Sequence, residues 1–473
     1  MASTGFDDIE EMGSVTKWFA TLSFGVDLLA GGDALSESGR DHFIIDTWTS
    51  GFRPPKIYDA PIAKELREKG GASKVDVKGV QDFIREYELH SLPGLVCANL
   101  SSVHPGRRVY LENSTRALEL MLHTLDGNCT NPAFDQKYGA VTGHRCELVN
   151  PTQKRVELQK ALADVGYQVT PQRDLRETLL AWKKDRGYVG DTGKGIDGEV
   201  VKAEVLRNAE KLLEITRERL FSQMDFEIPG HKPDLSDISF KGYEFKSLSG
   251  VDFSGSSIYR GGGEDDANLA GLLEYNTDHP LTRPGIVHLA SHEVMPGHWL
   301  NSAVADLLGR AGKLPFESTM NFMCAPSTVF QEGWADTALS TIYGSRRKAI
   351  EGVAKDFGLN PVDVEITLLC GDLQNIGKHN VSILYQREGR TLDEVKKYVA
   401  GDCVQRDSIV KKLSGGWAQH LIMGPMYGPA YHVGSEMVSS ALRDVGSRRV
   451  AEVGLQTEGR LADVATFKGQ IYS

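Results

Sequence analysis

Apolar residues recur at helical spacing along most of this chain. Near the N-terminus, Trp18, Phe19, Leu22, Val26 and Leu29 follow the period of one helical face, and the Gly-Gly pair at 31–32 is a typical helix stop. The same period predicts further helices at 80–89, 114–125, 154–165, 174–184, 200–224, 329–344, 361–385, 391–400 and 430–445. We therefore expect a mainly α fold.

A few segments lack the helical period. Residues 236–259 mix glycine, serine and aromatic residues, which predicts a small sheet or hairpin. Loops are indicated by composition at 128–150, 187–198 and in the acidic turn 260–266, the last of which suits the rim of a cleft. At this length we expect two regions packed as one unit: a helical N-terminal region, 1–199, and a region, 200–473, that carries the candidate chemistry.

Composition limits the partners. The formal net charge is −11 and no basic stripe is present, which argues against a nucleic-acid partner. The apolar segment 15–31 contains Lys17 and Asp27 and is too short and polar to span a bilayer. The acidic N-terminus is the opposite of a secretory leader. Together with six scattered cysteines, these features predict a cytoplasmic protein with reduced thiols and no membrane partner.

The strongest chemical signal is the run from His288 to His298. It contains His292 followed by Glu293, and then Pro296-Gly297-His298, instead of the His-Glu-x-x-His spacing of many zinc hydrolases. Six residues at about 100° each would place the two imidazoles roughly 240° apart on a regular helix. A proline and glycine between them predict a helical bulge that turns His298 back toward His292. The alternative is a helix that ends at Met295, a turn, and a second helix with incidental histidines.

A third ligand is expected from Glu332, which follows His298 by thirty-four residues on a predicted helix. Two imidazoles and a carboxylate leave one coordination position of a zinc ion open for water. His288 competes for a place because it lies four residues before His292, but no carboxylate stands between that pair. We interpret His288 as a supporting or core residue. Asp336, one turn after Glu332, is either an exposed carboxylate or a group that orients a ligand histidine.

Several motifs occur together in the order seen in a known family. They are Pro284-Gly285 followed by His292-Glu293-Val-Met-Pro296-Gly297-His298, then Glu332-Gly-Trp-Ala335, Asn375-Ile-Gly-Lys-His379 with Gly389-Arg-Thr391, and Tyr427-Gly-Pro-Ala-Tyr431-His432-Val-Gly434. Over about residues 200–473 the chain resembles the bacterial domain-of-unknown-function family numbered 885, which looks like a distant set of zincin-type metallohydrolases. The resemblance implies a large, helical, funnel-like fold with a deep central cleft and a minor β element.

The resemblance also implies roles for individual residues. His292, His298 and Glu332 would bind the metal, Glu293 would be the general base, and Tyr431 or His379 would donate a hydrogen bond to the developing oxyanion. The chain departs from the family at two positions. Trp299 stands where a second histidine is usual, and His432 where a lysine is frequent. Both positions are expected to face the cleft and to influence the substrate and the reaction.

The leading hypothesis is a metal-dependent hydrolase, with Zn²⁺ as the expected ion, that uses activated water to cleave an amide or peptide-type bond in a small molecule or short peptide. The same ligand set also suits Fe²⁺ in a non-haem oxygenase or a metal-dependent lyase. Glu293 favours hydrolysis, because an oxygenase needs no base there. A metal-stabilised scaffold without activity is a third possibility. Candidates for binding a substrate carboxylate are Arg260, Arg387 and Arg390, and no sequence argument selects one of them.

Overall fold

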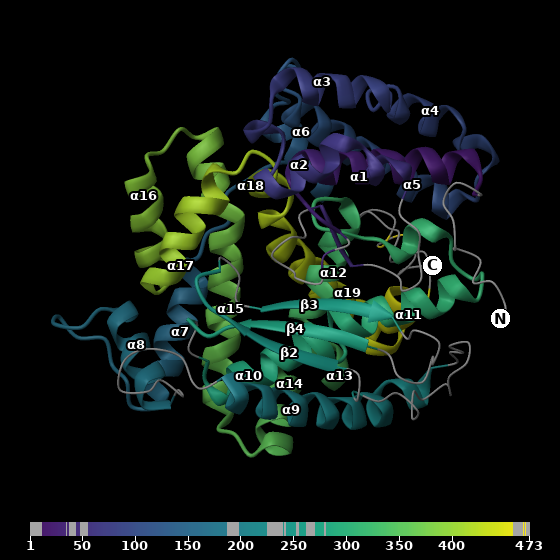
Figure 1. The fold of residues 1–473 in the computed structure, drawn as a ribbon. Coiled ribbons are helices and arrows are strands. Elements are labelled where there is room, and N and C mark those ends of the chain that lie inside the picture. The colour runs from purple at the N-terminus through teal and green to yellow at the C-terminus, as the bar shows by residue number, and fades with distance from the viewer. Residues whose placement is uncertain are drawn as a thin grey trace.

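The computed structural model describes residues 12–34, 36, 44–47, 55–186, 198–224, 240, 243–251, 255–261, 270–278, 281–456, 467 and 469. Helices make up most of this part of the chain, and a three-stranded sheet lies among them (Figure 1). The predicted mainly α fold with a minor β element is confirmed. Within the described segments, no helix has the length and apolar character needed to cross a membrane.

The N-terminal helices lie together at the top of Figure 1. They are α1 (Ser14–Ala30), α2 (Pro61–Lys69), α3 (Val77–Glu86), α4 (Leu92–Ala98), α5 (Pro105–Leu125) and α6 (Phe134–Thr142). Helix α1 ends as predicted, at Gly31, whose φ of 87° is in the left-handed region that glycine adopts readily.

Helix α6 contradicts the prediction of a surface loop over 128–150. Its Tyr138 is buried, and it packs in a small apolar cluster with Cys146 and with Ile383 from a distant part of the chain. This contact between remote segments stabilises a helix that the local composition does not favour.

Three helices follow, α7 (Thr152–Asp164), α8 (Leu175–Arg186) and α9 (Gly198–Arg219). All three were predicted from their apolar period, with ends shifted by a few residues. The predicted loop at 187–197 and the acidic turn from 262 to 266 lie outside the described residues.

The expected small sheet is present. Strands β2 (Tyr243–Leu248), β3 (Gly255–Gly261) and β4 (Ala270–Asn276) form a sheet in the order β2-β4-β3. Strand β2 is parallel to β4, and β3 is antiparallel to it. A second, short pairing joins β1 (Ile45–Thr47) to β5 (Asn321–Phe322). Edge strand β3 borders the candidate site, because its Gly255 lies directly over the side chain of Glu293.

The C-terminal half supplies the remaining helices. They are α10 (Arg283–Leu289), α11 (His298–Arg310), α12 (Pro326–Asp336), α13 (Ala338–Tyr343), α14 (Arg346–Phe357), α15 (Pro361–Ser382), α16 (Leu392–Lys397), α17 (Asp407–Lys412), α18 (Met423–Met426) and α19 (Gly428–Gln456). The largest apolar core contains buried side chains from both the N-terminal and the C-terminal parts of the chain, among them Phe19 of α1, Phe322 of β5 and Trp334 of α12.

Helices α12 and α19 approach each other very closely. A Cβ atom added to Gly333 would lie 2.3 Å from the backbone of Gly434, and one added to Gly434 would lie 2.0 Å from the Val329 carbonyl oxygen. Only glycine permits this contact between two backbones. The crossing matters for the site because Gly333 directly follows Glu332.

Candidate metal centre

The segment from His292 to His298 changes direction instead of continuing as one helix. Helix α10 passes into a π-helical turn at Ala290–Val294, the Met295–Pro296 peptide is cis, and α11 begins at His298. The predicted bulge within a single helix is therefore wrong, and the alternative of two helices is right about the backbone. The two histidines are nevertheless brought together, because they lie on either side of the turn.

Gly297 allows this turn to be tight. A Cβ atom at this position would lie 1.7 Å from the His292 carbonyl oxygen and 2.5 Å from that of Ser291. Its φ of −69° is ordinary for any residue. Glycine is thus required here for the close approach of two backbone segments and not for an unusual φ.

The side chains of His292, His298 and Glu332 converge on one point. The Nε2 atoms of His292 and His298 are 3.2 Å apart. The Oε2 atom of Glu332 lies 3.7 Å from His292 Nε2 and 3.6 Å from His298 Nε2. Three ligand atoms from three helical segments therefore face one another, as the sequence predicted.

These separations fit a metal ion. Nitrogen and oxygen ligands at zinc bond lengths in a tetrahedron lie about 3.3–3.4 Å from one another. A hydrogen bond could explain the contact between the two imidazoles, but not the position of Glu332. Its Oε2 atom is buried and has no hydrogen-bond partner among the described residues. Because buried carboxylate oxygens are rarely left without a partner, the donor set fits a divalent cation.

Neighbouring side chains hold two of these ligands in place. The Asp336 Oδ1 atom lies 3.0 Å from His292 Nδ1, which directs His292 Nε2 toward the other ligands. Asp336 Oδ2 accepts hydrogen bonds from Asn375 and Ser435. Burial opposes the charge on Asp336, but the hydrogen bond and charge of His292 outweigh it and lower the pKa of this carboxyl.

Glu332 is held in a comparable way. The Tyr427 hydroxyl donates a 2.8 Å hydrogen bond to Glu332 Oε1, which leaves Oε2 directed at the imidazoles. Burial raises the pKa of Glu332, but the charges of His298 and His292 outweigh it and lower the pKa below its ordinary value. The carboxylate form that metal binding requires is thus favoured by its surroundings.

Glu293 and Tyr431 lie at the same place. Glu293 is buried, and its Oε1 atom is 4.0 Å from His292 Nε2. The Tyr431 hydroxyl is 2.7 Å from that of Tyr427. Burial raises the pKa of Tyr431 well above its ordinary value, so this phenol keeps its proton and can act as a hydrogen-bond donor.

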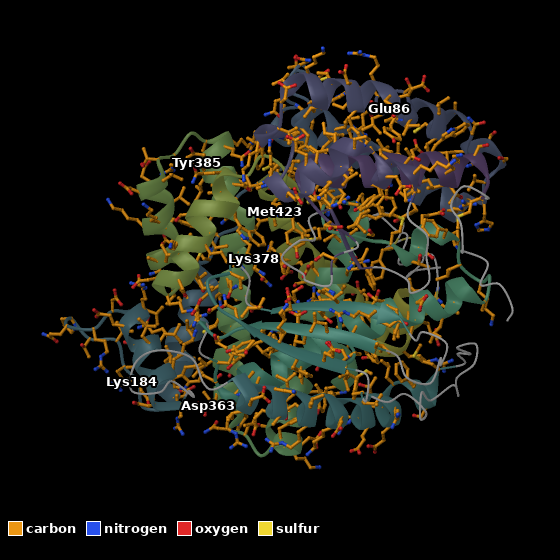
Figure 2. The ribbon with its side chains drawn as sticks, viewed as in Figure 1. Glu86, Lys184, Asp363, Lys378, Tyr385 and Met423 are labelled. Atoms are coloured by element: carbon orange, nitrogen blue, oxygen red, sulfur yellow. The ribbon has the colours of Figure 1, made fainter. Side chains whose placement is uncertain are left out.

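A cavity of about 500 Å³ opens onto these residues. It is lined by the ligand set, by Glu293 and Tyr431, and by Lys378 of α15. The Lys378 ammonium lies 3.0 Å from the centre of the Tyr431 ring. Burial lowers the pKa of Lys378. Figure 2 shows Lys378 and Met423, another lining residue, near the middle of the molecule.

His379 does not reach this cavity. It is buried between other groups, with Nε2 2.9 Å from the Tyr138 hydroxyl and Nδ1 2.8 Å from Asn380 Oδ1. We therefore assign it no role at the reacting atoms, contrary to the expectation from the resemblance. Asn375 contacts Asp336, and both Lys378 and His379 follow it at helical spacing, so periodicity could not choose between them.

The buried position of His379 predicts sensitivity to acid. Burial lowers its pKa to about 4 from an ordinary 6.5. As the pH falls from 6.5 to 4, the unfolded chain binds a proton that the folded chain does not, so folding stability decreases by up to about 3 kcal/mol. We expect His379→Gln to lose less stability over this range than the wild type, measured as the free energy of urea unfolding at each pH. Equal losses in the two proteins would contradict this assignment.

The two departures from the family pattern also lie away from the cavity. Trp299 is fully buried against the rings of Phe240, Tyr243 and Tyr259 beneath the sheet. The His432 ring lies 5.4 Å from that of His379. Neither lines the cavity, so the expectation that both face the cleft is wrong. Trp299 directly follows His298, and His432 directly follows Tyr431. Each side chain nevertheless points from its helix into the surrounding packing.

The three candidate arginines are engaged elsewhere. Arg387 pairs with Asp135, Arg390 with Glu388, and Arg260 lies 3.7 Å from Glu244. None of them lines the cavity. The cations that do line it are different residues: Lys183, Lys378, Arg406 and Lys412. Of these, only Lys378 lies within a motif that the sequence analysis quoted, directly before His379.

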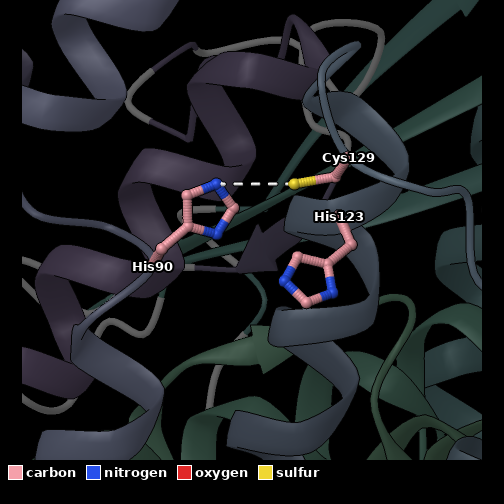
Figure 3. A group of neighbouring side chains, drawn as sticks. All are labelled: His90, His123 and Cys129. Carbon is pink, nitrogen blue, oxygen red and sulfur yellow. Dashed lines mark hydrogen bonds between the residues drawn. The ribbon is translucent and has the colours of Figure 1, made fainter.

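A second group of possible metal ligands lies on α5 and on turns between the N-terminal helices (Figure 3). It consists of His90, His123 and Cys129, whose candidate ligand atoms lie within 4.8 Å of one another. Asp126 explains this arrangement without an ion. It lies 2.8 Å from His90 Nε2 and accepts a hydrogen bond from the Cys129 thiol. Burial and the hydrogen bond to Asp126 raise the pKa of Cys129, which disfavours the thiolate that a metal would need.

His288 lies beside the centre and also lines the cavity. Its ring centre is 6.1 Å from that of His292, and its Nδ1 atom is buried without a hydrogen-bond partner among the described residues. Burial lowers the pKa of His288 to about 4, with the charge of His292 as a further cause. The neutral imidazole is therefore the favoured form.

Comparison with known proteins finds no family profile that matches the chain. No curated protein sequence matches it either. Among solved structures, the fold of this chain is similar to the crystal structure of "the putative lipoprotein from Colwellia psychrerythraea". The two sequences are 14% identical, the match covers 87% of this chain and 75% of that chain, and the TM-score is 0.50. A "putative lipoprotein of unknown function from Shewanella oneidensis" matches at 12% identity over 87% of this chain and 68% of that chain, with a TM-score of 0.44. At such low identity, the first likeness concerns the fold alone.

Proposed function

We propose that this protein is a metal-dependent hydrolase that cleaves an amide or peptide-type bond in a small substrate. The observation that carries the proposal is the convergence of His292, His298 and Glu332 Oε2, an atom without a hydrogen bond, at a cavity that also holds a buried carboxylate, Glu293. A divalent ion held there, zinc in the first place, would supply Lewis acidity toward a carbonyl and a water molecule.

The chain's own residues provide the remaining chemistry. Glu293 would take a proton from the water that attacks the carbonyl carbon, and would pass it to the nitrogen as the carbon–nitrogen bond breaks. Its burial beside the ligands keeps bulk water from competing for that proton.

Tyr431 would stabilise the negative charge that develops on the carbonyl oxygen. The only proton of Tyr427 is donated to Glu332, so Tyr431 must donate its own proton to the Tyr427 oxygen in the structure described here. A rotation of the Tyr431 hydroxyl would redirect this proton to a bound substrate. The cavity volume is in the range of sites for small molecules and short peptides.

The same two imidazoles and carboxylate also suit a non-haem iron oxygenase or a metal-dependent lyase. The position of Glu293 supports hydrolysis over oxygenation, because hydrolysis requires a proton acceptor beside the metal ligands and oxygenation does not. Iron chemistry on the same ligand set is the alternative proposal.

Metal analysis tests the proposal. Protein purified without added metal is expected to contain about one zinc per chain and to hydrolyse amide or short-peptide substrates. Chelation should abolish turnover, with little change in the helical circular-dichroism signal, and added zinc should restore it. Bound iron with oxygen-dependent turnover would overturn the proposal in favour of the oxygenase. A large loss of helical structure on chelation would instead indicate a structural metal.

A further inference from the structure

Most of the cations around the cavity lie apart from its carboxylates. All its carboxylates in the described part of the chain belong to the metal centre: Glu293, Glu332 and Asp336. Lys378 of α15 lies close to these carboxylates, whereas the other lining cations come from α8, α17 and the residue before α17: Lys183, Arg406 and Lys412. A pocket with positive side chains beyond its metal ligands is complementary to a substrate that carries negative charge.

Lys183 and Arg406 form the part of this lining that the metal centre does not explain. Hydrogen bonds hold the segments that carry them. Trp182 Nε1 donates to Asp363 on α15, and Arg176 Nε donates to the carbonyl of Gln405. Helix α8 is thus fixed both to α15 and to the segment that contains Arg406, so the positions of the two cations are set by the fold.

The surroundings of Lys183 disfavour an uncompensated charge. Burial lowers the pKa of Lys183; Cys370 acts in the opposite direction, and the charge of Arg406 acts in the same direction as burial. Burial also lowers the pKa of Arg406, to about 10. Within the described segments, Lys183 has no ion pair with a carboxylate. A desolvated cation is stable in proteins when an anion compensates it, and a bound substrate could do so at Lys183.

We propose that Lys183 and Arg406 bind an acidic group of the substrate, a carboxylate or a phosphate. The placement of the rest of the substrate rests on the proposed hydrolase function. The bond to be cleaved then lies at the metal centre, and the acidic group lies at these two cations. The apolar lining residues Trp182, Leu281 and Ile409 would contact the uncharged part between them. The substrate class is then a small amide or peptide with an acidic end.

Calorimetric binding to the Glu293→Gln protein, in which hydrolysis of the probes is slowed, tests this, with the variants below made in the same background. The probes are N-acetylglycylglycine, its C-terminal amide and inorganic phosphate. We expect the free carboxylate to bind at least about tenfold more tightly than the amide, because hydrogen bonds to charged groups are stronger than those between neutral groups. Lys183→Gln and, independently, Arg406→Gln should reduce this ratio to near one.

Matched controls come from neighbouring residues. Lys184→Gln and Lys411→Gln remove exposed lysines next to lining residues, and both should keep the wild-type ratio. Figure 2 shows Lys184 near the edge of the molecule, away from Lys378. Melting temperatures would identify any variant that fails to fold. If either Lys183→Gln or Arg406→Gln fails to fold, the other variant decides the test.

Repeating the titrations on chelated protein separates this inference from the proposed function. If the free carboxylate still binds more tightly than the amide after chelation, the result supports the anion site independently of the metal. A ratio that is lost on chelation would show that the anion binds the metal, and would overturn the inference. Equal binding of carboxylate and amide, with no phosphate binding that depends on Lys183 or Arg406, would also overturn it. If only phosphate depends on Lys183 and Arg406, the site stands and its ligand is a phosphate.

Discussion

Replacing Glu293 with glutamine is expected to lower kcat by about 10²–10⁴-fold while the protein keeps its metal. The amide of glutamine is close in size to the carboxylate but cannot accept the proton of the attacking water. Glu293 is buried near the proposed metal ligands but is not one of the three ligand residues, so the metal content should not change. The measurements are steady-state kinetics on a hydrolysed peptide and metal analysis of the same sample.

A surface control makes this result specific. Glu351→Gln removes an exposed carboxylate that pairs with Arg347 on α14, and it should leave both metal content and kcat unchanged. If Glu293→Gln keeps its metal together with full activity, Glu293 is not the general base. If it loses its metal, Glu293 takes part in binding the ion and the ligand set must be revised.

Replacing Gly297 with alanine is expected to remove most of the bound metal and to lower activity by more than about 10²-fold, since displacements near 1 Å can have effects of this size. The added Cβ atom would lie 1.7 Å from the His292 carbonyl oxygen, so the turn must open and the two imidazoles must separate. Overpacking of this kind costs about 1–3 kcal/mol, which is less than the stability of a typical domain. The variant should therefore fold with reduced stability.

Gly94→Ala is the matched control, because no atom lies within 4 Å of a Cβ atom added to this residue of α4. It should keep both metal and activity, and its stability should be equal or slightly higher. Full metal content and wild-type kinetics in Gly297→Ala would show that the close backbone contact does not control the position of His298.

The position of Glu332 depends on packing that is remote in sequence from the two histidines. Helix α12 brings Glu332 to the site, and α12 is seated on α19 by the contact between Gly333 and Gly434. Helix α19 begins one residue after Tyr427, whose hydroxyl orients the Glu332 carboxylate. One helix crossing thus places both the third candidate ligand and the residue that holds it.

Sequence reasoning was most successful where the signal is local. The apolar period located most helices, because a helix that covers a core needs one apolar face whatever its partner is. It did not find α6, whose Tyr138 is stabilised by residues far along the chain. The π-helical turn was also missed, and the break before His298 was given only as the alternative, since a proline and glycine permit several backbone paths and the packing around Gly297 selects one.

Residue types and spacing selected His292, His298 and Glu332 as a candidate ligand set, and the family resemblance added Glu293 as a candidate base, because metals and proton transfer demand particular side chains. Only the tertiary structure decided which neighbours face them. It placed Lys378, Tyr427 and the pair Lys183 and Arg406 at the cavity, and it directed His379, Trp299 and His432 into the packing. The physical reason is that a side chain's environment depends on how helices distant in sequence cross, and no local pattern records those crossings.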